Sequence, residues 1–256
     1  MIDSHTHLTY PQLADRLDTV LQNARQAGVT GMITIGTDIA DAGKAIALCR
    51  QHPHIRCAIG IHPHHSAEAT DAHLTRLAEL EADPVVLALG EMGLDYHYDF
   101  SPRDVQKRVF LAQLDIARRR NRPIVIHCRE AIDDCLAILR DFPAIRADFH
   151  CFTGFKSEAR RILDLGHMIG LTGVVTYKKS DELREIAAFI PDAQLLVETD
   201  APYLAPEPVR KQKNNEPAFV IHTAAAIARI RGVTLQKLDE ITTTNIARFF
   251  GWSAAL

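Results

Sequence analysis

Two histidines stand one residue apart near the start of the chain, His5 and His7 in the segment IDSHTH. The residues around them have the pattern of a buried strand, in which alternate side chains point to the same face. Both imidazoles therefore project together, and imidazole nitrogens are common ligands of Zn²⁺ and related cations. Two arrangements fit this pair: a chelating site completed by ligands from elsewhere in the chain, or two hydrogen-bonded histidines at a strand end.

Further His, Glu and Asp residues follow other short apolar runs. They are His62, Glu91, His127, His150 and Asp200, each at or directly after the end of such a run. A lone residue of this kind is usually a satisfied polar group. Together with His5 and His7 they come from six separate strands, and such a ring is hard to explain in that way, so the sequence predicts a metal site built from several strand ends.

Alternating apolar runs and helical patterns must position these residues. The predicted strands are 1–7, 31–36, 56–61, 85–90, 123–128, 146–151, 167–172 and 195–200. The predicted helices are 13–27, 38–51, 66–81, 102–120, 131–141, 156–165, 180–189, 216–231 and 234–250. This alternation is typical of parallel βαβ units and predicts an α/β chain with a (β/α)8 TIM barrel and two helices after the last strand. Active sites of such barrels lie at the C-terminal ends of the strands, where the polar residues occur.

A doubly wound open sheet is the alternative, but no GxGxxG motif follows any predicted strand. A chain of 256 residues fits one barrel, so we expect a single domain over 1–256. The five cysteines are odd in number and form no CxxC, which argues against a disulfide framework and against a thiolate zinc site.

The composition is that of an ordinary globular protein, 47% hydrophobic and 24% charged. No apolar run approaches the roughly 18 residues that a membrane span needs. Met1 leads directly into the first predicted strand, which predicts a cytoplasmic protein that does not contact a membrane. The net charge of -3 gives no general attraction to nucleic acid, so a phosphate-rich substrate needs local positive charge. The densest basic run, ARRRNR at 117–122, closes a predicted helix and reads as an exposed helix end away from the site.

Six motifs carry a family resemblance, in the order IDSHTHL, AIGIHPHH, LGEMGLDYHYD, IVIHCREA, HCFTG and ETDAPYLAP. They resemble the TatD family of metal-dependent hydrolases, the TatD-type DNases of the amidohydrolase superfamily. The match runs essentially end to end, including the closing TTTNIARFFG. The resemblance implies a (β/α)8 barrel with a two-metal site that hydrolyses phosphodiester bonds.

The same resemblance implies which residues hold the metals: His5, His7, Glu91, His127, His150 and Asp200. His5, His7 and Asp200 would hold one ion together with Glu91, and the remaining two histidines would hold the second. Glu91 would bridge the ions, which agrees with a carboxylate having two oxygens. Four imidazoles and two carboxylates suit Zn²⁺ or Mn²⁺ better than Mg²⁺, although the sequence leaves all three open.

A mechanism follows from two cations about 3.5 to 4 Å apart. A hydroxide held between them becomes the nucleophile near neutral pH. Asp200, facing that hydroxide, is the natural general base and can later protonate the leaving oxygen. Asp200 and Glu91 are therefore the predicted catalytic residues.

Three residues are candidates for substrate binding. The resemblance suggests that His62 faces the substrate, with a structural role as the alternative. Arg129 lies two residues after His127 and could grip a phosphate, or instead pair with Glu130 or Asp133. Lys178 follows the seventh strand, a frequent phosphate position in these barrels, and could equally be a surface charge.

The loop after the last strand departs from the family pattern RGKRNEP and reads RKQKNNEP. The glycine is absent, one residue is added, and Asn214 stands where the arginine would be. This change leaves the conformation of the loop and its contact with phosphate open.

The leading functional hypothesis is a phosphodiesterase, an exonuclease acting on the ends of single-stranded DNA, with nucleic acid as its substrate partner and no obligatory protein partner. The alternative is an ester or amide hydrolase on the same two metals, such as an aminoacyl-tRNA deacylase. A metal-bearing barrel recruited for binding is the third. Only 6% of residues are aromatic, and Tyr96, Tyr98, Tyr177 and Tyr203 are the candidates for contacts with bases.

Overall fold

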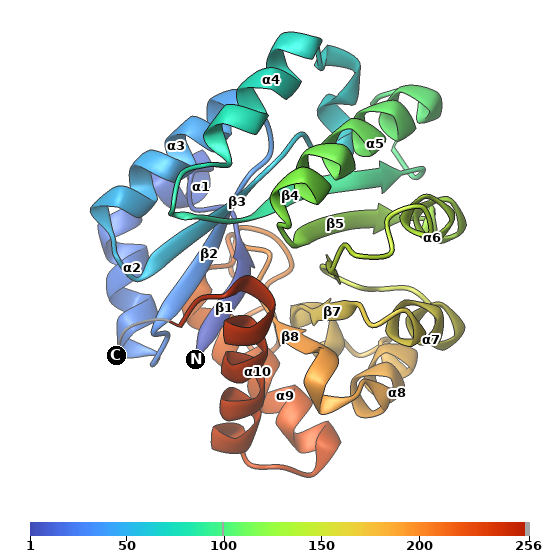
Figure 1. Cartoon of the computed structure of the whole chain (residues 1–256). Helices are drawn as coiled ribbons and strands as arrows, with labels where there is room; N and C mark the ends of the chain where they lie inside the picture. Colours follow the sequence, from blue (N-terminus) through green and yellow to red (C-terminus); the bar gives the residue numbers. More distant parts are fainter. Residues whose placement is uncertain (99, 254–256) are drawn as a thin grey trace. The chain divides into compact units, whose positions relative to one another are not determined.

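The structure, a computed structural model, describes residues 1–98 and 100–253 (Figure 1). Its strands are β1 Ile2–Thr6, β2 Gly31–Gly36, β3 Ile55–Ile59, β4 Val86–Asp95, β5 Ile124–Arg129, β6 Ala147–Phe149, β7 Met168–Leu171 and β8 Leu195–Val197. They form one eight-stranded sheet in the order β1 to β8. A parallel bridge from Thr6 to Ala201 joins β1 to the segment after β8, so the strand order returns to its start. The predicted (β/α)8 fold is confirmed.

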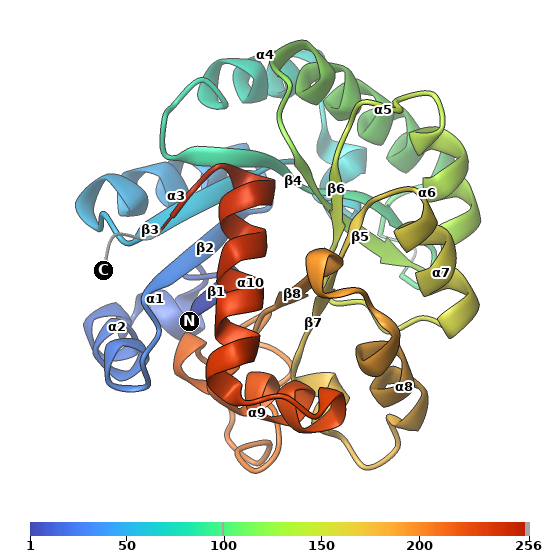
Figure 2. The same cartoon turned by 60° about the horizontal axis from the view of Figure 1, so that its bottom comes forward.

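Ten α-helices alternate with or follow the strands in the described residues. They are α1 Pro11–Ala14, α2 Leu17–Gln26, α3 Ile39–Gln51, α4 Asp71–Leu80, α5 Arg103–Arg120, α6 Ile132–Leu139, α7 Lys156–Asp164, α8 Asp181–Phe189, α9 Val220–Arg231 and α10 Leu235–Phe250. Short 3₁₀ turns lie at η1 Pro63–Glu68, η2 Gly173–Thr176, η3 Asp192–Gln194 and η4 Pro217–Phe219. The last two α-helices follow β8, as predicted (Figure 2).

The chain divides into two compact units. Named by their places in the sequence, the outer unit comprises Met1–Thr34 and Cys151–Leu256, and the central unit comprises Ile35–His150. The expectation of a single domain over 1–256 stays a prediction. Each unit is described below by itself.

In the central unit, α5 packs along β4 (Figure 1). Phe110, Leu114 and Ala117 recur at helical spacing and are buried, so they form the apolar stripe that the helix turns toward the sheet. Full burial of a large apolar side chain contributes roughly 1.5–3 kcal/mol. The helix ends at Asn121, which adopts a left-handed conformation with φ 51°.

In the outer unit, α10 packs beside β1 and β8 (Figure 2). Its buried apolar residues are Leu238, Ile246, Phe249 and Phe250. Asn245 on the same helix donates from Nδ2 to the carbonyl of Leu195 at 2.8 Å. This bond ties the helix to the start of β8, the strand that precedes Asp200.

The element bounds differ from the prediction at several places, including the helix predicted over 216–231, which begins as the 3₁₀ turn η4. The helix predicted over 13–27 is two helices, α1 and α2, separated at Asp15 and Arg16. The helix predicted over 66–81 begins as the 3₁₀ turn η1, and α4 starts only after Thr70, whose side chain accepts the N–H of His73. The strand predicted at 85–90 runs on to Asp95, which alters the site.

The basic run at 117–122 is more than an exposed helix end. Arg120 and Arg122 both pair with the buried Glu81, at 2.8 Å and 3.3 Å from its carboxylate oxygens. Arg118 pairs with Asp115 on the helix surface, as an exposed helix end would predict. Part of the run therefore stabilises a buried carboxylate.

No single helix in the described part of the chain is long and apolar enough to cross a membrane. The segments Pro217–Arg231 and Leu235–Phe250 meet that length and composition only as a pair, and this pair is bent by 107°.

Candidate metal centre

In the outer unit, the two histidines of β1 converge on the aspartate that follows β8. Oδ1 of Asp200 lies 3.2 Å from Nε2 of His7 and 3.7 Å from Nε2 of His5. The side chain of Asp200 is only 13% exposed. Nδ1 of His7 is buried and lacks a hydrogen-bond partner within the described chain. The donor atoms of the three residues lie within 4.8 Å of one another, which fits them to hold a cation.

Backbone contacts between β1 and the segment after β8 fix this arrangement. The N–H of Asp200 donates to the carbonyl of His5 at 2.9 Å, and the N–H of His7 donates to the carbonyl of Ala201 at 2.8 Å. Asp200 itself has φ 54°, a left-handed conformation that is uncommon outside glycine. The backbone on both sides therefore holds the carboxylate toward the histidines.

A buried carboxyl group adds a second link between the same segments. Oδ1 and Oδ2 of Asp3 accept the backbone N–H and the hydroxyl of Thr199 at 2.9 Å and 2.6 Å. Burial raises the pKa of Asp3 to about 8, although the hydrogen bonds from Thr199 lower it. This group positions Thr199, the residue directly before Asp200.

In the central unit, three imidazoles lie around one carboxylate oxygen of Glu91. Oε1 of Glu91 lies 2.7 Å from Nε2 of His150, 2.8 Å from Nδ1 of His127 and 3.4 Å from Nε2 of His62. Burial by itself raises the pKa of Glu91. The charges of His150 and His62 and the hydrogen bonds from the imidazoles outweigh that effect and hold the pKa well below its usual range. Glu91 is therefore a buried anion surrounded by nitrogen donors.

An irregularity in β4 places Glu91 among these histidines. Leu89 pairs with Ile124 of β5 and Met92 pairs with Ile126, so β4 has one more residue than its partner over this stretch. Such a bulge redirects side chains and is common next to active sites. The prediction that Glu91 follows the end of its strand is wrong: it lies inside β4, at the bulge.

Gly93 allows the two strands to approach closely just beyond the bulge. It pairs with His127 and has φ +136°, and a Cβ atom at this position would lie 2.1 Å from the carbonyl oxygen of His127. Only glycine fits there. From the sequence, the pattern GEMG indicates the end of a strand. In the structure, the glycines of this pattern allow β4 to pack closely against β5.

The extension of β4 reveals a site residue that the sequence reasoning missed. Oδ2 of Asp95 lies 2.8 Å from Nε2 of His127 and 2.9 Å from Nε2 of His64. Burial raises the pKa of Asp95, but the hydrogen bonds from both histidines and from the backbone of Tyr98 outweigh it and hold the pKa far below its usual range. Strand alternation could have indicated Asp95 from the sequence, because position 95 lies four residues after Glu91 and is on the same face if the strand continues.

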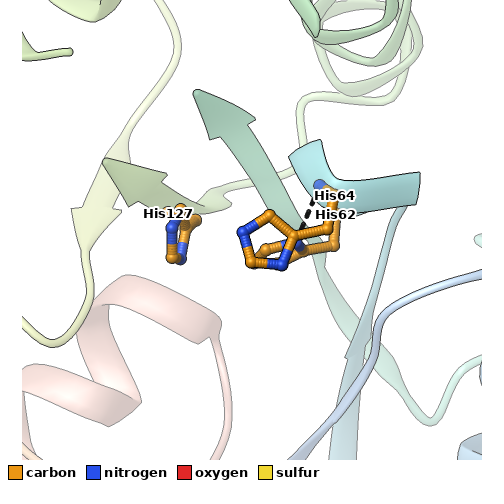
Figure 3. A group of neighbouring side chains, drawn as sticks. All are labelled: His62, His64 and His127. Atoms are coloured by element: carbon orange, nitrogen blue, oxygen red, sulfur yellow. Dashed lines mark hydrogen bonds between the residues drawn. The ribbon is translucent and has the colours of Figure 1, made fainter. Parts of the chain in front are cut away.

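His62, which the resemblance suggests faces the substrate, is a buried residue. It is 8% exposed, and burial lowers its pKa to about 3. Figure 3 shows it beside His64 and His127, and the backbone N–H of His64 donates to its Nδ1 at 3.1 Å. The donor atoms of these three histidines lie within 4.8 Å of one another, as do those of Glu91, His127 and His150. His62 therefore belongs to the donor cluster of the central unit.

The other predicted substrate-binding residues are exposed. Arg129 places its guanidinium 4.8 Å from the ring centroid of Tyr98. Glu130, one of the partners considered for it, lies instead 2.7 Å from Nδ1 of His97. Lys178 is exposed after η2.

The altered loop RKQKNNEP is anchored at both ends. At its start, the guanidinium of Arg210 lies 3.8 Å from the ring centroid of Tyr177. At its end, Nδ2 of Asn215 donates to the carbonyls of Thr199 and Tyr203 at 2.9 Å and 2.6 Å. Lys211 and Lys213 between them are exposed. The residues that differ from the family pattern thus lie between two segments held by contacts, at Arg210 and at Asn215.

A family model described as TatD related DNase matches residues 2–251. The chain belongs to this family. A Bacillus subtilis protein named as the uncharacterized metal-dependent hydrolase YabD is 37% identical over 252 residues, which is 98% of each chain. The protein of Erwinia amylovora named 3'-5' ssDNA/RNA exonuclease TatD is 39% identical over 261 residues, covering 98% of this chain and 100% of that one.

Solved structures agree with the sequence relatives. The TatD homologue YjjV from Escherichia coli K12 superposes with a TM-score of 0.93 at 28% identity, covering 98% of both chains. The predicted resemblance and the predicted enzyme class, a metal-dependent hydrolase of TatD type, are confirmed at the level of the family. Each unit of the chain holds clusters of donors that could bind a metal ion. The number and identity of the ions, and the roles of single residues, stay predictions.

Proposed function

We propose that this TatD-family hydrolase is a two-metal phosphodiesterase that removes nucleotides from the ends of single-stranded nucleic acid. The main support for this proposal is that one carboxylate oxygen of Glu91 lies 2.8 Å from His127 and 2.7 Å from His150. Such an arrangement of a buried anion and imidazoles suits a divalent cation. The name of the Erwinia relative, a 3'-5' exonuclease of single-stranded DNA and RNA, supports the choice of substrate.

Each unit would contribute one set of ligands. His5, His7 and Asp200 would hold one ion in the outer unit, and Glu91, His127 and His150 would hold another in the central unit. The bridging role of Glu91 stays a prediction. Imidazole and carboxylate donors favour Zn²⁺ or Mn²⁺, with Mg²⁺ as the third candidate.

A divalent ion held by these residues would polarise the phosphoryl group and lower the pKa of the attacking water. The chain itself supplies the proton acceptor: Asp200, held by the backbone of β1, would take the proton of that water and pass it to the leaving oxygen. Asp95 keeps the ring of His127 in one orientation, with Nδ1 toward Glu91. Arg129 and Lys178, both exposed, would bind phosphates of the strand.

Metal content and activity, measured together, test this proposal. The purified protein is analysed for bound metals, stripped with a chelator, and assayed on single-stranded DNA and RNA with Mg²⁺, Mn²⁺ or Zn²⁺ restored. We expect about two ions per chain and metal-dependent release of mononucleotides. Bound metal without any cleavage of nucleic acid, but with release of amino acid from aminoacyl-tRNA, would replace the proposal by the deacylase alternative. A protein that binds no metal would contradict both.

A further inference from the structure

Two aromatic rings of the central unit stand exposed and stacked in the loop after β4. Tyr98 is 40% exposed and Phe100 is 64% exposed. Their ring centroids lie 5.3 Å apart and their planes differ by only 5°. Single exposed apolar side chains are common on protein surfaces, but here two rings stack on each other, and the high exposure of Phe100 leaves flat ring surface open to solvent. A flat aromatic surface is what a nucleobase stacks on.

The loop that carries these rings is tied to the candidate metal centre. Oδ1 of Asp95 accepts the backbone N–H groups of His97 and Tyr98, both at 2.9 Å, while its Oδ2 contacts His127. One carboxylate therefore holds both the base of the loop and a proposed metal ligand. A stacking surface fixed in this way keeps a constant distance from the reacting bond.

A single imidazole separates the rings from His127. The ring of His64 lies 5.8 Å from that of His127 and meets Phe100 edge to face, at 4.8 Å and 86°. It meets Tyr98 in the same way, at 5.6 Å and 89°. Both aromatic residues thus contact His64, a member of the donor cluster, so a nucleotide next to one bound at the cluster can reach them.

A positive charge accompanies the stacked rings. Arg129, two residues after His127 on β5, places its guanidinium 4.8 Å from the ring centroid of Tyr98 and is itself exposed. A guanidinium over an aromatic ring is attracted by the π electrons and keeps its N–H groups for an anion. An aromatic face next to a cation matches the two parts of a nucleotide, its base and its phosphate.

We propose that Tyr98, Phe100 and Arg129 form a stacking subsite for the nucleotide next to the cleaved bond, with the base against the rings and the phosphate on the guanidinium. This inference rests on the proposed nuclease function. It also gives a physical reason why such a nuclease would prefer single strands. A base can stack on the rings only when it has left its own helix. Because every base has a π face, the subsite tolerates any sequence and accepts DNA as well as RNA.

Replacement of Phe100 tests the subsite. Phe100→Ala should raise KM for a single-stranded oligonucleotide by at least about five-fold, since loss of a stacked base costs about that much or more. Phe100→Trp should restore KM, because the larger ring also stacks. Phe155→Ala is the matched control, since Phe155 is exposed to a similar degree, at 63%, and belongs to the outer unit. An unchanged KM in Phe100→Ala would overturn the subsite.

An abasic substrate separates stacking from other effects. When the nucleotide beside the cleaved bond lacks its base, wild type and Phe100→Ala should have the same KM. A Phe100→Ala protein that is equally impaired on the abasic strand would show that the ring acts on the fold or on the phosphate, and would contradict the stacking subsite.

A binding measurement keeps this inference apart from the nuclease proposal. A phosphorothioate oligonucleotide carrying terminal 2-aminopurine should lose fluorescence on binding to wild type and keep it with Phe100→Ala. Quenching in a protein that releases no nucleotide would leave the subsite standing and remove the nuclease function. Nucleotide release without Phe100-dependent quenching would support the nuclease function and contradict the subsite.

Discussion

The imidazole of His127 lies between two carboxylates: Nε2 is 2.8 Å from Oδ2 of Asp95, and Nδ1 is 2.8 Å from Oε1 of Glu91. Burial alone lowers the pKa of His127, but the hydrogen bonds with Asp95 and Glu91 outweigh it and raise the pKa to about 9. Histidines that bind metals commonly donate their second ring N–H to a carboxylate, which fixes the ring and strengthens the ligand. Asp95 has that position relative to His127.

Replacement of Asp95 should weaken metal binding without unfolding the chain. In Asp95→Asn the side chain keeps its size but loses its charge, so we expect metal affinity to fall by about 10- to 100-fold. Titration of the stripped protein with Zn²⁺ or Mn²⁺ in a calorimeter measures this change. Asp115→Asn, which removes an exposed carboxylate paired with Arg118, is the control and should bind metal as wild type does. Equal affinities for both variants would contradict the role of Asp95.

Replacement of Asp200 should reduce turnover much more than metal content. The amide of Asp200→Asn retains an oxygen for a cation but accepts no proton, and loss of a general base typically costs about 10²- to 10⁴-fold in rate. Single-turnover cleavage of labelled single-stranded DNA gives the rate, and elemental analysis gives the metal content. Asp18→Asn, on the exposed surface of α2, serves as control. A near-normal rate in Asp200→Asn would assign proton transfer to another group.

The strands that carry the proposed ligands could be predicted because their signals are local. Strand alternation places His5 and His7 on one face whatever lies elsewhere in the chain, and the structure brings both to Asp200. The order of βα units likewise follows from apolar runs and helical spacing. For this reason the fold, and the approach of His5 and His7 to Asp200, agree with expectations from sequence.

The length of β4 could not be predicted because its cause is not local. Gly90 and Gly93 weaken the strand pattern, yet Gly93 is required by the carbonyl of His127, more than thirty residues further along the chain. Asp95 was missed as a result. The burial of His62 has a similar origin, since its position depends on Glu91 from the neighbouring strand.

The anchor of the altered loop should contribute strongly to stability. Asn215→Ala removes three side-chain hydrogen bonds and leaves the carbonyls of Thr199 and Tyr203 without this donor, so we expect a loss of about 2 kcal/mol or more in the free energy of unfolding. Urea denaturation measures it. The neighbouring half-buried Asn214, which occupies the position of the family arginine, is the matched comparison, and Asn214→Ala should cost no more than about 0.5 kcal/mol. Similar losses in both variants would refute the anchor.

Acid should destabilise the chain partly through His167, which precedes β7 and is 7% exposed. Burial lowers its pKa from 6.5 to about 4. As the pH falls from about 6.5 to about 4, the unfolded chain binds a proton at this residue and the folded chain does not, so folding stability decreases over that window by roughly 3 kcal/mol. Above the window the contribution is fully present.

A variant without this imidazole isolates its effect on the acid dependence. In His167→Gln, the free energy of unfolding should fall less steeply between pH 6.5 and 4 than in wild type, as measured by urea denaturation of the metal-stripped protein at several pH values. His73→Gln is the control, because His73 is exposed on α4 and its replacement should leave the slope unchanged. Parallel curves for wild type and His167→Gln would mean that other groups cause the acid sensitivity. A shallower curve only in His167→Gln would assign it to the buried imidazole, since the two variants differ in which histidine the fold shields from water.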